Sequence, residues 1–158
     1  IRLSALQEAG VSFEVVPGIT AAAAAASSAG ISLTRRGRNS SVRFLTGRDT
    51  KGFAEHDWRE LARPGSGAAI YMGVKAATFL RGRLMMHGAE ADTPVTVVEN
   101  ASRADQKTVA TTLLNLPEAL ADAGIAGPAV LLYGMAPRQA VSALETAATQ
   151  IHENAGAL

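Results

Sequence analysis

The stretch FEVVPGITAAAAAA, residues 13–26, marks the clearest change from one kind of backbone to another in this sequence. Residues 13–16 form a short β-branched run that predicts a strand, and Pro17-Gly18 ends it. Residues 19–29 predict a helix, with Thr20 at its start and a glycine directly after it. Alanine is the strongest helix former, and a helix with almost no larger side chains lets a neighbour approach its backbone. The stretch therefore predicts a strand–turn–helix unit with a closely approached helix.

The rest of the chain alternates predicted strands with predicted helices. We expect strands at residues 41–46, 68–72, 93–99 and 128–133, and helices at 3–9, 58–62, 75–87, 116–123 and 141–153. The strands are mostly continuous apolar runs, which are typical of a sheet covered on both faces. Residues 107–114 predict a further strand or edge element, which indicates at least one antiparallel pair. The pattern predicts an α/β fold with a mixed, mostly parallel sheet flanked by helices.

Composition favours a globular domain and excludes several classes of site. The chain has 158 residues, of which 47% are hydrophobic and 18% charged, and this suits one compact unit with a core. A net charge of +1 gives no general basic field, so we expect no nucleic-acid partner. No apolar run reaches the length of a membrane span, so we expect no membrane partner. The absence of cysteine excludes thiolate nucleophiles and fits a cytoplasmic location. The three histidines show no metal spacing, so no metal site is predicted.

Four predicted strand ends carry small or polar residues, at positions 17–20, 46–48, 71–73 and 99–101. Ligands of open α/β sheets bind beyond the carboxyl ends of strands, and small residues permit close approach. Free N–H groups near Thr20 and Ala21 can hold a polar ligand, although Thr20 can equally act only as a helix cap. Met72 is either a thioether contact to a ligand or a core residue. Four arginines either line a pocket for a polyanion or form a solvated face: Arg35, Arg36, Arg38 and Arg48.

No Walker A, GxGxxG, HExxH or GxSxG motif is present. The residues by themselves therefore predict an α/β ligand-binding domain with a pocket of small residues.

Six motifs carry a resemblance to a known family. AGVSFEVVPGITAA, GISLTRR, SVRFLTG, YMG, PVTVVENAS and PAVLLYG follow the order and spacing of the tetrapyrrole methylases, over essentially the whole chain. The likeness is strongest to members that C-methylate uroporphyrinogen III, either as stand-alone enzymes or as the C-terminal part of sirohaem synthase. The resemblance implies a two-domain homodimer that binds S-adenosyl-L-methionine between its domains and releases precorrin-2 and S-adenosyl-L-homocysteine. It implies cofactor contacts at Thr20, Ala21, Met72, Ala101 and Ala129, and substrate contacts at Arg36, Arg48 and Met72.

The resemblance also implies how the chain divides into domains and where the catalytic groups lie. Residues 1–16 are expected to be the tail of an N-terminal domain, and residues 17–158 the C-terminal methylase domain. The catalytic groups are expected in that preceding domain, so we expect this chain alone to be inactive. Because the sulfonium methyl group is already activated, alignment with a pyrrole carbon should dominate catalysis.

The chain departs from the family pattern at two places. It has LTRRG where LTHRD is common and TGR where TGH is common, so Arg35, Gly37 and Arg48 leave substrate handling open. Two alternative functions remain: another precorrin methyltransferase of cobalamin synthesis, and a non-catalytic dimerisation or binding module.

Overall fold

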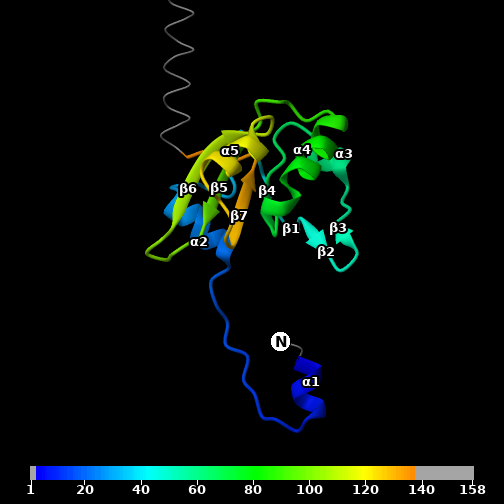
Figure 1. Cartoon of the computed structure of the whole chain (residues 1–158), viewed down its shortest axis with the longest axis vertical. Helices are drawn as coiled ribbons and strands as arrows, with labels where there is room; N and C mark the ends of the chain where they lie inside the picture. The colour runs from blue at the N-terminus through cyan, green and yellow to red at the C-terminus, as the bar shows by residue number, and fades with distance from the viewer. Residues whose placement is uncertain (1–2, 138–158) are drawn as a thin grey trace, which may run out of the picture.

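A computed structural model describes residues 3–137, which fold around a five-stranded sheet with the order β1-β4-β7-β5-β6 (Figure 1). The strands of this sheet are β1 (Arg43–Thr46), β4 (Ala68–Tyr71), β5 (Pro94–Glu99), β6 (Lys107–Thr112) and β7 (Ala129–Tyr133). The helices are α1 (Leu3–Glu8), α2 (Ala21–Ser28), α3 (Trp58–Leu61), α4 (Ala77–Met86) with a preceding 3-10 turn η1 (Val74–Ala76), and α5 (Leu116–Asp122). A small hairpin that the sequence did not predict joins β2 (Arg48–Asp49) to β3 (Gly52–Phe53). The helix expected at residues 141–153 lies outside the described residues.

The directions of the strands correct one expectation. The sheet is mixed and flanked by helices, as predicted, and β6 pairs with β5 as an antiparallel edge strand. The expectation of a mostly parallel sheet is wrong, because only β1 and β4 are parallel neighbours, whereas β7 runs antiparallel to both β4 and β5. A continuous apolar run reports burial on both faces of a sheet. A central strand covered by helices on both faces is apolar whether it runs parallel or antiparallel to its neighbours. The apolar run therefore could not reveal the direction of β7.

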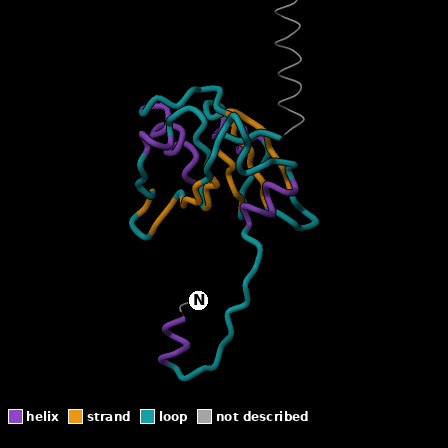
Figure 2. The backbone as a smooth tube through the Cα atoms, turned by 180° about the vertical axis from the view of Figure 1, so that it is seen from behind, coloured by secondary structure: helices purple, strands orange, loops and turns teal. Residues whose placement is uncertain are grey.

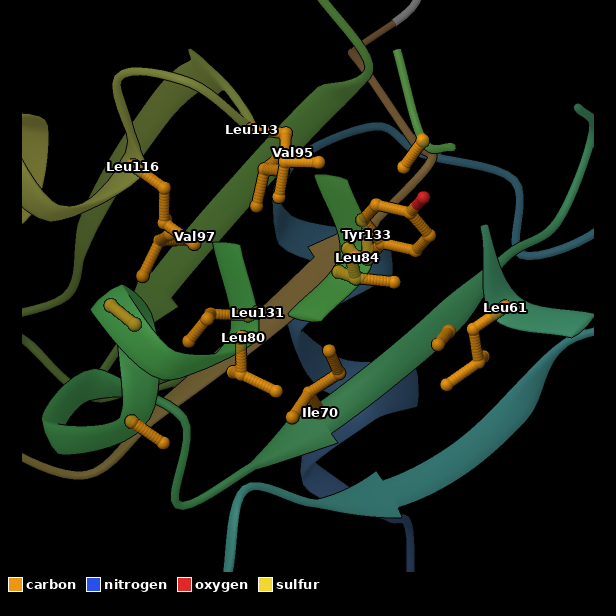
Figure 3. Packing of buried hydrophobic residues seen from close by; sticks show 14 of the residues in the cluster. Leu61, Ile70, Leu80, Leu84, Val95, Val97, Leu113, Leu116, Leu131 and Tyr133 are labelled. Atoms are coloured by element: carbon orange, nitrogen blue, oxygen red, sulfur yellow. The ribbon is translucent and has the colours of Figure 1, made fainter. Parts of the chain in front are cut away.

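The sheet separates two hydrophobic cores, because successive side chains of a strand point to opposite faces. On β7, Leu131 and Tyr133 pack with residues of α3, α4 and α5, and Figure 3 shows this larger core. Val130 and Leu132 point the other way and pack with α2. The three layers are therefore α2, the sheet, and the group of α3, α4 and α5.

The alanines of α2 allow it to pack directly on the sheet. Ala22, Ala25 and Ala26 are buried against the face formed by β7 and its neighbours. Thr20 begins the helix, and its Oγ1 accepts a hydrogen bond from the Ala23 N–H at 3.2 Å. The predicted helix is confirmed, and so is the interpretation of Thr20 as its cap.

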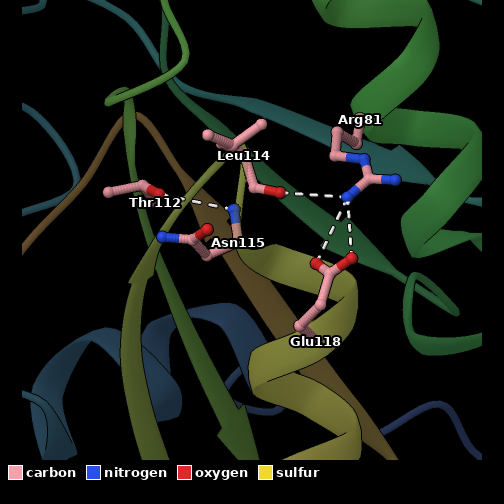
Figure 4. A network of polar contacts seen from close by, with 5 residues as sticks. All are labelled: Arg81, Thr112, Leu114, Asn115 and Glu118. Atoms are coloured by element: carbon pink, nitrogen blue, oxygen red, sulfur yellow. Dashed lines mark hydrogen bonds and ion pairs between the residues drawn. The ribbon is translucent and has the colours of Figure 1, made fainter.

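On the opposite layer, one arginine links two helices. Arg81 of α4 donates from Nη1 to both carboxylate oxygens of Glu118 in α5, at 3.1 and 3.2 Å, and to the Leu114 carbonyl at 3.1 Å (Figure 4). These contacts hold α5 beside α4 in the helical layer that covers β5 and β7.

The segment between α1 and α2 lacks the strand expected at residues 13–16. Residues 11–20 are extended and exposed, and α1 buries no residue (Figures 1 and 2). Val16 and Ile19 are 75% and 86% exposed. A strand needs a neighbour to satisfy its N–H and C=O groups, and no described residue pairs with this segment. None of the helices among residues 3–137 has the length and apolar character needed to cross a membrane.

Candidate functional site

A cavity of about 730 Å³ opens at one edge of the sheet. β1, β4 and β5 run in one direction, so their C-terminal ends meet at this edge, together with the first residues of the antiparallel β7. The cavity wall combines the start of α2, the ends of β4 and β5, and the loop before β7. Its volume lies within the range of small-molecule sites. It brings together five residues predicted as contacts: Ala21, Arg48, Met72, Ala101 and Ala129.

Two residues with a left-handed backbone line the cavity. Met72 and Asn100 follow directly after β4 and β5, and both adopt a left-handed backbone, with φ of 51° and 50°. For a bulky residue such as Met72 this conformation costs about 1–3 kcal/mol and persists only where the surroundings enforce it, whereas asparagine adopts it more readily. At Met72 the support comes from Gly47, whose N–H donates to the Tyr71 carbonyl at 2.6 Å. The Asn100 N–H in turn donates to the Pro128 carbonyl at 3.0 Å. Strain of this kind concentrates at ligand sites.

Glu99 fixes the loop that forms one wall of the cavity. Its side chain is only 7% exposed, and its Oε1 accepts the N–H groups of Ala126, at 2.9 Å, and of Gly127. These two donors, helped by Lys107 at 3.8 Å from Oε2, lower the pKa of the Glu99 carboxyl. The carboxylate is therefore ionised at neutral pH and holds the loop before β7 in place.

The start of α2 leaves one main-chain donor for a ligand. The Ala22 N–H donates to the Tyr71 hydroxyl at 3.1 Å, and the Ala23 N–H donates to Thr20. Among residues 3–137, no hydrogen bond is formed by the Ala21 N–H, and Ala21 lines the cavity. Free N–H groups at a helix start bind anionic or polar groups. Thr20 itself is not part of the cavity lining, and both of its oxygens accept hydrogen bonds from the helix, Oγ1 from the Ala23 N–H and the carbonyl from the Ala24 N–H.

Three cationic side chains line the cavity: Arg48 of β2, Lys75 of η1 and Arg103 of the loop after β5. None of the three takes part in an ion pair within the described part of the chain. Sequence reasoning missed Lys75 and Arg103. Each lies two residues after a predicted strand end, at 71–73 and 99–101, so a search for charges next to the small residues would have found them.

Arg36 lies away from this cavity. It lines a separate hollow formed by the loop at residues 34–40, which precedes β1. Ala136, which follows β7, lies against the same loop. The starts of β1 and β4 and the end of β7 define the opposite edge of the sheet. A strand rises about 3.3 Å per residue, so the length of β4 and β7 separates Arg36 from Met72. Of the predicted contacts, Thr20 and Arg36 are the two outside the cavity lining.

Metal chemistry has no ligand set among residues 3–137, because no group of three or more histidine or carboxylate side chains comes together there.

Comparison with known proteins identifies the family. The model of the Tetrapyrrole (Corrin/Porphyrin) Methylases matches residues 2–117. The chain belongs to the tetrapyrrole methylase family. The resemblance predicted from the motifs is thereby confirmed.

Curated relatives in this family are much longer than the chain. The siroheme synthase of Chromobacterium violaceum is 44% identical over 133 residues, which cover 84% of this chain and 28% of that protein. The siroheme synthase of Gluconacetobacter diazotrophicus is 42% identical over 141 residues, which cover 89% of this chain and 30% of that protein. The chain therefore matches less than a third of the length of these relatives.

Solved structures in the family share the fold. A cobalt precorrin-4 methyltransferase of cobalamin biosynthesis superposes with a TM-score of 0.73 at 29% identity, over 84% of this chain and 56% of that one. A uroporphyrin-III C-methyltransferase from Thermus thermophilus, complexed with S-adenosylhomocysteine, gives a TM-score of 0.65 at 29% identity, over 82% of this chain and 55% of that one. The predicted α/β architecture with a mixed sheet and flanking helices is confirmed.

Proposed function

We propose that this chain is the C-terminal domain of an S-adenosyl-L-methionine-dependent enzyme that C-methylates uroporphyrinogen III to precorrin-2. The observation that carries the proposal is the cavity at the sheet edge, where the ends of the motifs PGITAA, YMG and VVENAS meet. Support comes from the siroheme synthases among the relatives and from a structural neighbour that holds S-adenosylhomocysteine.

The cavity has the properties that this cofactor needs. Ala21, Ala101 and Ala129 leave room for a bulky ligand, and the Ala21 N–H offers a donor for a polar group. Met72 is 59% exposed and presents a polarisable thioether to the cavity. When bound, S-adenosyl-L-methionine supplies an activated methyl group. The role of this chain is to hold the cofactor and to orient the substrate.

Substrate recognition is assigned to the cationic lining. Uroporphyrinogen III carries many carboxylates, and the side chains of Arg48, Lys75 and Arg103 offer charges that no acid of the described chain neutralises. A local positive lining attracts a polyanion even where the net charge is only +1. The contacts expected at Thr20 and Arg36 stay predictions, as do the homodimer and the cytoplasmic location.

We further propose that residues 1–16 end a preceding domain that carries the catalytic groups. This division is supported by the exposed apolar side chains of residues 11–20 and by the greater length of the relatives. In such a protein the exposed segment would pair with the preceding domain, and the cofactor would bind between the two domains.

Isothermal titration calorimetry with S-adenosyl-L-homocysteine tests the division. The 158-residue chain should bind much more weakly than a protein that also carries the preceding domain. Equal affinities would refute a cofactor site that is split between two domains.

Turnover tests the reaction. The two-domain protein, incubated with uroporphyrinogen III and S-adenosyl-L-methionine, should develop the absorbance of precorrin-2. A second candidate is a later precorrin methyltransferase, favoured by the higher TM-score of the cobalt precorrin-4 enzyme. Methylation of a later precorrin, with no reaction of uroporphyrinogen III, would support that candidate. Failure of the two-domain protein to bind S-adenosyl-L-homocysteine would favour the alternative of a non-catalytic module.

A further inference from the structure

Arg48, the arginine found where the family commonly has histidine, is held by a neighbouring aromatic ring. Arg48 and Phe53 face each other across the hairpin of β2 and β3. The guanidinium carbon of Arg48 lies 5.5 Å from the centroid of the Phe53 ring, and the same arginine lines the cavity. This is the geometry of a cation–π contact, in which the face of the ring attracts the charge.

The Phe53 ring is anchored to the core through a row of aromatic side chains. It stacks on Phe79 of α4, with the ring centroids 4.6 Å apart and an angle of 12° between the planes. Phe79 in turn meets Trp58 edge to face at 5.7 Å. Trp58 is 3% exposed, and its Nε1–H donates to Glu55 at 2.8 Å. The row therefore runs from a fixed core residue to the cavity lining and ends at Arg48.

The turn of the hairpin has its own support, independent of this row. Asp49 Oδ1 accepts hydrogen bonds from the N–H groups of Lys51, at 2.7 Å, and Gly52, at 3.0 Å. These two hydrogen bonds close the turn of a hairpin whose strands have only two residues each. A substitution of Phe53 therefore leaves the hydrogen bonds that close this turn in place.

We propose that Phe53 is a positioning residue that holds the Arg48 guanidinium at the cavity for a carboxylate of the substrate. The inference rests on the proposed function, since it requires a polycarboxylate tetrapyrrole in this cavity. A guanidinium lying on a ring keeps its N–H edge available for a carboxylate. Holding a long side chain in place before binding removes part of the entropy cost of ordering it. Arginine at position 48 therefore works together with an aromatic residue at position 53.

A fluorescence titration of the two-domain protein with uroporphyrin III, a stable and fluorescent polycarboxylate, tests this role of Phe53. Phe53→Leu keeps an apolar contact to Phe79 and removes the ring, and it should weaken binding about two- to fivefold. Phe53→Tyr keeps the ring and should restore wild-type affinity. Arg48→Gln should weaken binding at least as much, and adding Phe53→Leu to it should have no further effect. Phe44→Leu is the matched control, because Phe44 on β1 is a similarly exposed phenylalanine outside the cavity lining.

The outcomes separate the two proposals. Absence of uroporphyrin binding by the wild-type protein would overturn the proposed function and the role of Phe53 with it. If the wild type binds, a Phe53→Leu effect that persists undiminished in the Arg48→Gln background would overturn the positioning role alone. Failure of Phe53→Tyr to restore affinity would also overturn it. Loss in Phe53→Leu, rescue by tyrosine and no added loss in the double variant would establish it.

Discussion

Replacing Gly47 by alanine tests how the ends of β1 and β4 build the cavity edge. Gly47 is buried directly after β1, and its N–H bonds to the Tyr71 carbonyl. A Cβ at this position would lie 2.8 Å from the Met72 carbonyl oxygen, 3.0 Å from the Gly73 Cα and 3.1 Å from the Ala76 Cβ. These atoms belong to the main chain or directly adjoin it, so none can rotate aside.

The expected cost is that of overpacking a fixed site. One added methyl group in a tight interior costs about 1–3 kcal/mol. For a domain of this size, each kcal/mol lowers the melting temperature by roughly 3–4 °C. Gly47→Ala should therefore lower Tm by roughly 3–12 °C in a thermal scan followed by circular dichroism. S-adenosyl-L-homocysteine binding should weaken as well, because the Met72 backbone must move.

Gly82→Ala supplies a control with the same chemical change and the opposite sign. Gly82 lies in α4, and a Cβ there would meet nothing within 4 Å. Alanine in place of glycine inside a helix stabilises by about 0.5–1 kcal/mol. Gly82→Ala should therefore raise Tm. The steric account of Gly47 is wrong if Gly47→Ala melts at or above the temperature of Gly82→Ala.

Three further substitutions test other contacts. Tyr71→Phe removes the acceptor of the Ala22 N–H and should cost about 0.5–1.5 kcal/mol in urea unfolding; an unchanged midpoint would show that this bond contributes nothing. Ala25→Leu should destabilise by about 1–3 kcal/mol, because Ala25 is fully buried between α2 and the sheet; wild-type stability would contradict the close packing. Glu99→Gln should lower Tm at neutral pH, because it replaces a carboxylate that accepts two N–H groups. Since the folded pKa of Glu99 lies below the ordinary 4.5, its stabilisation is present above pH 4.5 and is lost as pH falls through the folded pKa. The difference in Tm from wild type should shrink in acid, and a constant difference would refute this linkage.

Local signals in the sequence were sufficient for most elements of the sheet. The apolar runs at 68–72 and 128–133 became β4 and β7, and the cap at Thr20 marked the start of α2. These elements follow from propensity and burial, which act within a short window of residues. The direction of β7 depends on which neighbours it meets across the sheet, and no local pattern reports that.

Two local misses have different physical causes. The run at 13–16 has strand propensity but no described partner, and propensity alone does not form a strand. The hairpin of β2 and β3 has strands of two residues, too short for any alternation of apolar and polar residues to show.

The sequence predicted the cavity from the small residues at the ends of predicted strands. Ala21, Met72 and Ala101 meet there because β4 and β5 end at one edge of the sheet, beside the start of α2. Ala129, at the start of β7, was expected only from the family resemblance. The separation of Arg36 from that edge depends on the course of the chain after α2. The role of Phe53 depends on a stack with α4. Both are tertiary facts that a single sequence does not display.

The position of β7 has a consequence for synthesis of the chain on the ribosome. β7 is the last strand of the described residues, yet it lies in the centre of the sheet between β4 and β5. Without β7 the sheet is reduced to two separate pairs, β1 with β4 and β5 with β6, and two-stranded pairs have little stability of their own. Both hydrophobic cores then also lack their β7 members. A nascent chain whose β7 is still inside the ribosome should therefore remain open to proteases, and emergence of this five-residue strand should convert it into a protected domain.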